Sequence, residues 1–382
     1  MKRKITVTTG SRADYGILRP VLKEITKSKK LKLYLIVAGM HLSKKHGLTI
    51  TEIKNDGFQI NTTIDMLTND DSLFSATQEL GKGIIKFAEV FNRIKPDINL
   101  ILGDRDEAFA SALAASHMNI PNAHIHGGDK SGGLDEYNRH AITKISNIHF
   151  PATKKSQQRI IQMGENSKFI FFTGSPSIDE VLSFEITAKN DLEKKYNMRL
   201  QGNEIILLYH PVTTQTNLDA LQIKMILDVI VMIKNTTIMI APNSDPGNKK
   251  IFTLMTKYAK KYNFIKMYPS IPRGDYLGLL KNCGVLIGNS SSGIIEASYF
   301  TIPVINIGIR QKSREKGKHI IDIENPSISL LHTSILMALK KKKQKPMINK
   351  SLYGTGHASK KIVKHLERIA INKNLIQKQI SY

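Results

Sequence analysis

The sequence contains a single cysteine, Cys283, among its 382 residues. One cysteine excludes a disulfide framework and a metal site built from cysteine pairs. Cys283 lies between a helical pattern and an apolar run in "GLLKNCGVLIGN". Because unpaired cysteine is among the residue types most often buried, we expect a small core side chain there rather than a reactive thiol.

Long apolar runs are also missing. The longest candidate, residues 223–233, is interrupted by Lys224 and Asp228, whereas a membrane-spanning helix needs roughly 20 apolar residues. The first residues, "MKRKITVTTG", begin with basic side chains but have no apolar signal core. With 41% hydrophobic and 23% charged residues, the composition is typical of a soluble globular protein. We expect a cytoplasmic protein that does not contact a membrane.

Acidic residues are few beside the basic ones, 32 against 56, which gives a formal net charge of +24. Such an excess raises the hypothesis of nucleic-acid binding. The lysines are nevertheless spread along the chain, and the one dense block is "LKKKKQKP" at 339–346. No recognised binding module and no aromatic-rich strand for stacking bases is present, so we predict no nucleic-acid partner. A basic surface also attracts a small polyanion such as a nucleotide diphosphate.

The dominant pattern is an alternation of apolar, strand-like runs with amphipathic segments such as 73–91 and 107–117. This alternation is typical of parallel sheets covered by helices on both faces. We expect strands at "KITVTTG", "KLYLIVAG", "FQINTTI", "INLILGD", "NAHIHGG", "IHFPAT" and "KFIFFTG", and then at "EIILLYH", "TTIMIAP", "FIKMYP", "GVLIGN" and "PVINIG".

A polar, lysine-containing stretch without a strand signal, residues 185–203, separates these two series. A chain of 382 residues is long enough for two domains. We therefore predict an α/β protein with two doubly wound, Rossmann-like domains and a cleft between them. The first covers residues 1–185 and the second 200–354, and the helical pattern within 355–382 is expected to cross back onto the first.

Sheets of this kind bind ligands at the carboxyl ends of their strands, so the loops that follow the predicted strands are the places to search. "TTGSRADYG" matches neither a dinucleotide fingerprint nor a P-loop, but it places Arg12 beside a glycine turn that suits an anion. "LLYHPVT" places His210 at a strand end facing the cleft, and "APNSDPG" places Asn243 at another. Each of these loops is also compatible with an ordinary solvated turn.

Hydroxyl groups gather after a strand of the second domain, in "LIGNSSSGIIEA". Backbone N–H groups and serine hydroxyls at a helix start favour a phosphate. Serine is an ordinary helix cap as well, but three serines and a glycine exceed what a cap needs. Glu296 follows one turn later and is placed to accept hydrogen bonds from sugar hydroxyls. The predicted diphosphate contacts are Ser290, Ser291, Ser292 and Gly293, with Arg310, Gln311 and Arg314 from "IGIRQKSREKG" closing over them.

Acids and imidazoles gather in the first domain, between residues 100 and 140. Asp104, Asp129 and Asp135 lie there with His124 and His126, at or beyond the ends of two predicted strands. The two histidines are two residues apart, so on a strand both would point to the same face. That spacing permits a metal pair, yet no cysteine is near. We favour an acid/base cluster over a metal site.

Together these segments resemble the hydrolysing UDP-N-acetylglucosamine 2-epimerases, in particular the sialic-acid-pathway branch. The resemblance covers nearly the whole chain, with the motifs in family order. It depends on "TGSRADYG", "VAGMH", "LGDRDEAF", "HIHGGD", "LDEYNRHAITKIS", "TGSPSID", "YHPVTT", "PNSDPG", "GNSSSGIIEA" and "IGIRQKSR".

The resemblance implies a GT-B architecture, a homodimer and a nucleotide-sugar substrate, with no metal or redox cofactor. UDP-N-acetylglucosamine would lose UDP from C1 and a proton from C2, giving a glycal that takes up water to form N-acetylmannosamine. Because C2–H is not beside a carbonyl, this reaction needs acid/base groups at the ring and donors on the departing diphosphate. The residues implied are Asp104, His126, Asp135 and His210 in catalysis, and Arg12, Asp129, Arg139, Asn243, Ser290, Ser291, Ser292, Gly293, Glu296, Arg310, Gln311 and Arg314 in substrate binding.

The chain departs from the family pattern at two positions. His126, in "HIHGGD", stands where many members have a glutamate, so either His126 or Asp129 takes the role of that acid/base group. Ile17 stands where members often have a lysine, and Arg19 is a candidate replacement.

Three further functions stay open. Relatives act on a 2,4-diacetamido-2,4,6-trideoxyglucose linked to UDP or GDP. A GT-B glycosyltransferase would use the same nucleotide cradle. A non-catalytic nucleotide-sugar binder would need no acid cluster.

Overall fold

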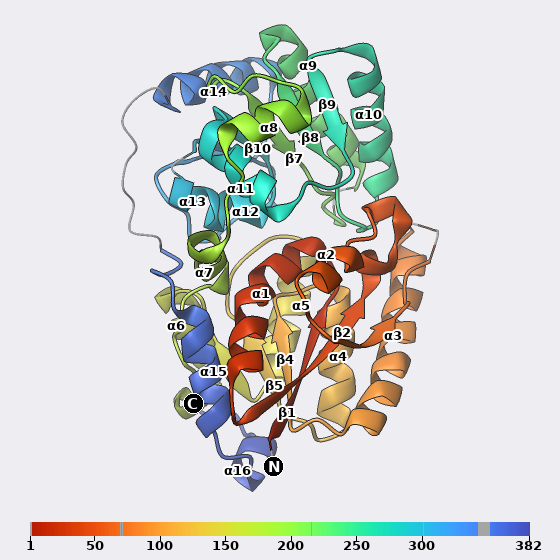
Figure 1. The fold of residues 1–382 in the computed structure, drawn as a ribbon, viewed down its shortest axis with the longest axis vertical. Helices are drawn as coiled ribbons and strands as arrows, with labels where there is room; N and C mark the ends of the chain where they lie inside the picture. Colours follow the sequence, from red (N-terminus) through yellow and green to blue (C-terminus); the bar gives the residue numbers. More distant parts are fainter. Residues whose placement is uncertain (1, 69, 71, 215, 301, 343–351) are drawn as a thin grey trace. The chain divides into compact units, whose positions relative to one another are not determined.

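The computed structural model describes residues 2–68, 70, 72–214, 216–300, 302–342 and 352–382, and these form two compact units (Figure 1). Unit 1 comprises the chain up to Asp129, then Asp135–Leu182 and the segment from Tyr353 onward. Unit 2 comprises Lys130–Leu134 and Ser183–Leu352. The C-terminal segment therefore returns to the unit in which the chain begins.

Each unit is built on a six-stranded parallel sheet. The strand orders are β3-β2-β1-β4-β5-β6 in unit 1 and β12-β11-β10-β7-β8-β9 in unit 2. Both orders reverse direction once, between β1 and β4 and between β7 and β10. This is the Rossmann arrangement, in which the strand ends at the reversal point are the usual ligand site. The predicted pair of doubly wound domains is confirmed.

The strands of unit 1 are β1 (Arg3–Thr9), β2 (Leu31–Ala38), β3 (Ile60–Ile64), β4 (Ile98–Leu102), β5 (Asn122–Ile125) and β6 (Ile148–Phe150). Its helices are α1 (Arg12–Lys27), α2 (Ile50–Asn55), α3 (Leu73–Ile94), α4 (Asp106–His117), α5 (Leu134–Lys144), α6 (Lys154–Gln162), α7 (Pro176–Ser183), α15 (Ala358–Arg368) and α16 (Lys373–Ile376), with short 3₁₀ turns η1 (Gly39–Leu42), η2 (Lys44–His46) and η3 (Ser167–Phe169).

The strands of unit 2 are β7 (Ile205–Leu208), β8 (Thr237–Ile240), β9 (Ile265–Tyr268), β10 (Val285–Gly288), β11 (Val304–Ile307) and β12 (Ile320–Ile323). Its helices are α8 (Lys189–Tyr196), α9 (Thr216–Ile233), α10 (Asn248–Lys261), α11 (Arg273–Asn282), α12 (Ser291–Ile295), α13 (Ala297–Phe300) and α14 (Ile328–Lys342). In the described part of the chain, no helix is both long and apolar enough to cross a membrane.

Strand β2 shows why these runs are apolar throughout. Leu35 and Val37 pack into the core under α1 and α15, whereas Ile36 and Ala38 pack with α3 and α4 on the other face. Successive side chains of a strand point to opposite faces, so a strand covered on both faces has no polar side. In β1 and β4 the second face carries buried polar side chains instead, where Thr6 bonds to Asn99 and Thr8 bonds to Ser111.

One strand prediction was wrong, and one strand was missed. "KFIFFTG" forms the 3₁₀ turn η3 and a single bridge from Ile170 to His149, because the Asn166 side chain accepts a hydrogen bond from the Lys168 N–H at 3.0 Å and starts a turn there. Strand β12, in "HIIDIEN", was not predicted, since its four residues include an exposed aspartate. Cys283 is fully buried, as predicted. Part of the basic block at 339–346 lies outside the described residues.

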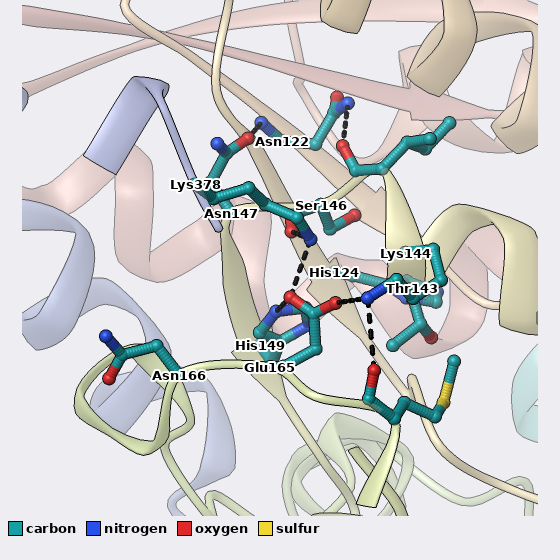
Figure 2. Close-up of polar contacts among 12 residues, drawn as sticks. Asn122, His124, Thr143, Lys144, Ser146, Asn147, His149, Glu165, Asn166 and Lys378 are labelled. Atoms are coloured by element: carbon teal, nitrogen blue, oxygen red, sulfur yellow. Dashed lines mark hydrogen bonds and ion pairs between the residues drawn. The ribbon is translucent and has the colours of Figure 1, made fainter. Parts of the chain in front are cut away.

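The C-terminal segment is fixed to unit 1 by polar contacts as well as by apolar packing. Asp179 accepts hydrogen bonds from three N–H groups at the start of α15, at 2.7–3.0 Å. Further along, the Lys378 ammonium group donates to the Glu165 carboxylate at 2.6 Å and to the Ser146 carbonyl at 2.7 Å. Figure 2 shows Glu165 at the centre of this cluster, with Lys144 and His149 also directed at its carboxylate.

Glu165 is nearly buried, and its ionisation is coupled to folding. Burial alone would raise its pKa, but hydrogen bonds from His149, Lys144 and Lys378 outweigh burial and lower the pKa to about 2. A lowered pKa contributes stability that is complete above the unfolded-state value near 4.5 and is lost as the pH falls toward 2.

We expect Glu165→Gln to lower the free energy of unfolding at pH 7 by about 3 kcal/mol, because it breaks a buried ion pair. That loss corresponds to a drop of about 5–10 °C in the melting temperature. The difference in the free energy of unfolding between this variant and the wild type should shrink as the pH falls from 4.5 to 2. Glu24→Gln is the matched control, since Glu24 pairs with the exposed Lys27 and such surface pairs contribute little. Equal melting curves for the two variants would contradict a stabilising role for the cluster.

Candidate active site

The reversal point of unit 1 brings the end of β1 next to the end of β4. Gly10 follows β1, and a Cβ there would lie 2.4 Å from Cδ of Glu107. The position therefore needs glycine, because the buried Glu107 side chain occupies that space. Arg105 lies 3.3 Å from Glu107 and 3.7 Å from Asp14.

Asp14 and Glu107 are two acids at this point that the sequence interpretation did not single out. Burial raises the pKa of Asp14 to about 6, although the Arg105 cation opposes the shift. A carboxyl that titrates near neutrality at a strand end is a candidate for proton transfer. "GSRADYG" contained the signal, since its acid follows the glycine turn by four residues.

Arg12 and Arg19, both from α1, are held by carboxylates. The Arg12 guanidinium forms an ion pair with Glu52 of α2, with Nε 3.1 Å from Oε2. Arg19 forms ion pairs with Asp56 and with Glu180 of α7. Ile17 packs against the core of unit 1. Arg12 thus keeps the strand-end position expected of an anion contact, whereas Arg19 is directed toward α2 and α7.

Asp104 follows Gly103, which has the positive φ of 72° that lets the chain turn sharply after β4. Its carboxylate forms an ion pair with Arg139 of α5, whose side chain is only 3% exposed. Nη1 of Arg139 also donates to the backbone carbonyl of Asp129 at 3.2 Å. The sequence predicted Asp104 and Arg139 as site residues, and the structure brings them into contact.

His124 has a structural role rather than a place in the acid/base cluster that we favoured. It is fully buried on β5, with Nε2 2.8 Å from the Gly103 carbonyl and Nδ1 3.2 Å from the Thr143 hydroxyl. Burial lowers its pKa to about 3, so the ring is neutral at physiological pH. The same-face argument for His124 and His126 was also wrong, because β5 ends at Ile125 and His126 has a left-handed φ of 65°.

His126 and Asp129 both lie in the turn after β5, and both are buried. The His126 Nε2 atom is 2.8 Å from the Ser175 hydroxyl oxygen. The Asp129 carboxylate accepts a hydrogen bond from the Ser156 hydroxyl at 2.6 Å. Neither serine was predicted, because each comes from a segment that is distant in the sequence.

Asp135 lies in the first turn of α5, where the helix dipole favours a negative charge. The loop before it, Lys130–Leu134, belongs to unit 2. Within that unit the Gly132 N–H donates to the Arg310 carbonyl at 2.8 Å. The loop between Asp129 and Asp135 in the sequence is thus part of unit 2.

The reversal point of unit 2 is organised by Asn289, a fully buried residue between β10 and α12. Its side chain accepts from the His210 N–H at 2.7 Å and donates to the His210 carbonyl at 2.8 Å. Its own carbonyl accepts from Arg310 at 3.3 Å and from Gln311 at 3.2 Å. Arg314 donates to the Gln311 side chain at 2.9 Å. Asn289 thus joins His210 to Arg310 and Gln311, two of the predicted diphosphate contacts, a role that the sequence did not reveal.

His210 has a defined tautomer in this arrangement. Its Nδ1 atom accepts a hydrogen bond from the Asn243 N–H at 3.1 Å. In the neutral ring the proton must then be on Nε2, so His210 presents a donor from the end of β7. A neutral donor at this position suits a phosphate oxygen.

Several residues of the predicted phosphate-binding loop, 290–293, have structural contacts of their own. Ser290 caps α12, and the Ser292 hydroxyl bonds to the Tyr276 and Ser290 hydroxyls. Gly293 faces the sheet, where a Cβ would lie 3.1 Å from Val304, so it is needed for packing. Glu296 is bound by both terminal nitrogens of Arg273, at 3.0 and 2.7 Å. Arg273 and Tyr276 were not predicted, since α11 carries no motif.

Two Rossmann-like domains, with acids at the strand ends of one and amide, hydroxyl and guanidinium donors at the strand ends of the other, define a protein of the GT-B class. The chain belongs to the UDP-N-acetylglucosamine 2-epimerase family, whose sequence profile matches residues 23–367.

Individual relatives agree with this assignment. The chain is 36% identical over 383 residues to a UDP-N,N'-diacetylbacillosamine 2-epimerase (hydrolyzing) from Legionella pneumophila, covering 100% of both chains. It is 34% identical to a UDP-N-acetylglucosamine 2-epimerase from Neisseria meningitidis, covering 85% of each. The crystal structure of a UDP-GlcNAc 2-epimerase from Neisseria meningitidis bound to UDP-GlcNAc has the same fold, with a TM-score of 0.80 at 19% identity over 95% of this chain and 99% of that one.

Proposed function

We propose that the protein is a hydrolysing 2-epimerase that converts UDP-N-acetylglucosamine and water into N-acetylmannosamine and UDP, acting as a homodimer. The observation that carries the proposal is the gathering of Asp104, His126 and Asp129 at the carboxyl ends of β4 and β5, with Asp135 in the next helix. Epimerisation at C2 needs several groups that accept and donate protons, and a glycosyltransferase needs one base at most.

In the first half-reaction a base takes the proton from C2 while the C1–O bond to UDP breaks, and the electrons of the C2–H bond form the C1–C2 double bond of the glycal. Negative charge collects on the leaving diphosphate, where His210 and the amide and hydroxyl donors of unit 2 lower its energy. In the second half-reaction an acid returns a proton to C2 from the opposite face, and water adds its hydroxyl to C1 and gives its remaining proton to a carboxylate. The sum consumes one water and releases UDP.

A second candidate substrate is the UDP-linked 2,4-diacetamido-2,4,6-trideoxyglucose. The full-length match to the Legionella pneumophila relative favours it. The chemistry at C1 and C2 is identical for both sugars, so the same acids serve either one. Only groups that face C4 and C6 of the sugar distinguish the two donors.

The test is incubation of the purified protein with each donor in deuterium oxide. We expect UDP release without an acceptor sugar, and a 2-epimerised free sugar that carries one deuterium at C2. The donor with the higher kcat/KM identifies the substrate. Product without deuterium would exclude the glycal route, and UDP release that needs an acceptor would indicate a transferase instead.

A further inference from the structure

Arg139 is a buried cation that touches two of the acid-bearing loops. Its guanidinium forms an ion pair with Asp104 in the loop after β4, and Nη1 donates to the Asp129 carbonyl in the loop after β5 at 3.2 Å. The side chain is only 3% exposed. We expected Arg139 to contact the substrate, but this arrangement places its charge on the acids themselves.

The helix that carries Arg139 is fixed against the same loop by two other side chains. Asn138 donates to the Asp106 carboxylate at 2.9 Å. Thr143 donates to the Arg139 carbonyl at 2.9 Å and also contacts His124, whose other ring nitrogen bonds to the carbonyl of Gly103, just before Asp104. Rotation or sliding of α5 would break all these contacts. These hydrogen bonds fix α5, and with it the position of Arg139, against the loop after β4.

The charged and titratable groups around this pair come from three elements. The loop after β4 contributes Asp104 and Asp106. Strand β5 and its turn contribute His124 and Asp129, and α5 contributes Glu136, whose Oε2 is 4.0 Å from Nη1. His124 stays neutral because burial lowers its pKa. Arg139 therefore lies near several carboxylates, and it forms an ion pair with that of Asp104.

We propose that Arg139 is a positioning residue that holds Asp104 in place and in its ionised form, so that Asp104 acts as a base in the proposed 2-epimerisation. This inference rests on the proposed function. Inversion at C2 requires one group that removes a proton and another that delivers one. An adjacent guanidinium favours the charged form of a carboxyl, which suits Asp104 to removal. Delivery then falls to an acid that Arg139 does not hold ionised.

The test compares Arg139→Met and Arg139→Lys with Arg3→Met, in which a cation bound to the Leu366 carbonyl at the other end of the sheet is lost. We expect Arg139→Met to lower kcat about a hundredfold while KM changes less than about threefold, with the acidic limb of the kcat profile moved up by about one pH unit. Arg139→Lys should recover part of kcat, because lysine restores the charge without the planar fork. Arg3→Met should leave kcat and its pH profile unchanged.

A second measurement needs no turnover. Carboxyl-¹³C NMR of protein labelled at aspartate, with Asp104 assigned by its loss in Asp104→Asn, reports the ionisation of that residue directly. We expect its titration to move to higher pH in Arg139→Met, whatever the substrate is. An unmoved titration would overturn the inference, and a higher KM with unchanged kcat would make Arg139 a substrate contact. Failure of the wild type to release UDP would instead refute the proposed function alone.

Discussion

Asp104→Asn should lower turnover at least about a hundredfold, and Asp135→Asn should do the same. Asparagine keeps the shape of each side chain but neither accepts nor delivers a proton, and a positioned acid/base group contributes typically 10²–10⁴ in rate. The Asp104 change also leaves the buried Arg139 cation without its carboxylate. The measurement is kcat for UDP release, with a thermal melt of each variant to show that it is folded.

Asp97→Asn is the matched control for both changes. Asp97 lies just before β4, at the opposite end of that strand from Asp104, and accepts a hydrogen bond from the Lys4 N–H at 2.7 Å. It is exposed, so its loss should change kcat less than about twofold. If Asp104→Asn and Asp135→Asn both retain near-normal turnover while remaining folded, the roles of the two acids are misassigned.

The sequence predicted the sheets well because the relevant signal is local. A strand covered on both faces is largely apolar, as in Leu35–Ala38, and such runs are visible without knowledge of their neighbours. The two failures have short or interrupted signals. "KFIFFTG" is apolar but turns at Asn166, and β12 contains only four residues.

The positions of the site residues followed from the same rule, that ligand groups lie at the carboxyl ends of parallel strands. Their partners did not. The Arg139–Asp104 and Arg273–Glu296 pairs and the contacts of Asn289 join segments that are 20 to 80 residues apart. No local pattern specifies which arginine meets which acid, so the sequence located these groups without revealing what holds them.

An arginine partner also changes the chemical role to which an acid is suited. Glu296 was expected to accept hydrogen bonds from sugar hydroxyls, yet both of its oxygens accept from Arg273. A buried arginine beside a carboxylate keeps that carboxylate charged, which suits acceptance of hydrogen bonds and excludes proton delivery. Asp104 is paired in the same way with Arg139, which suits it to the removal of a proton.

The replacement of the family glutamate by His126 leads to the last prediction. Asp129→Asn should lower kcat at least about a hundredfold, whereas His126→Asn should lower it less than about tenfold. The group that delivers a proton to C2 must first take one up, so it needs an acceptor position for that proton. The Asp129 carboxylate has about four acceptor positions, and the Ser156 hydroxyl donates to it at 2.6 Å. The His126 ring offers one lone pair when it is neutral, and its Nε2 atom is bound to Ser175.

Asparagine is the right replacement for His126, because it tolerates the left-handed backbone at φ 65° better than most residues. The change therefore tests the ring rather than the turn. Histidine and carboxyl groups titrate about two pH units apart, so the kcat profile gives an independent answer. If Asp129 is the group, wild type and His126→Asn should share the pH limb that this group sets. A limb that disappears in His126→Asn, together with a small effect of Asp129→Asn, would assign the proton transfer to the imidazole.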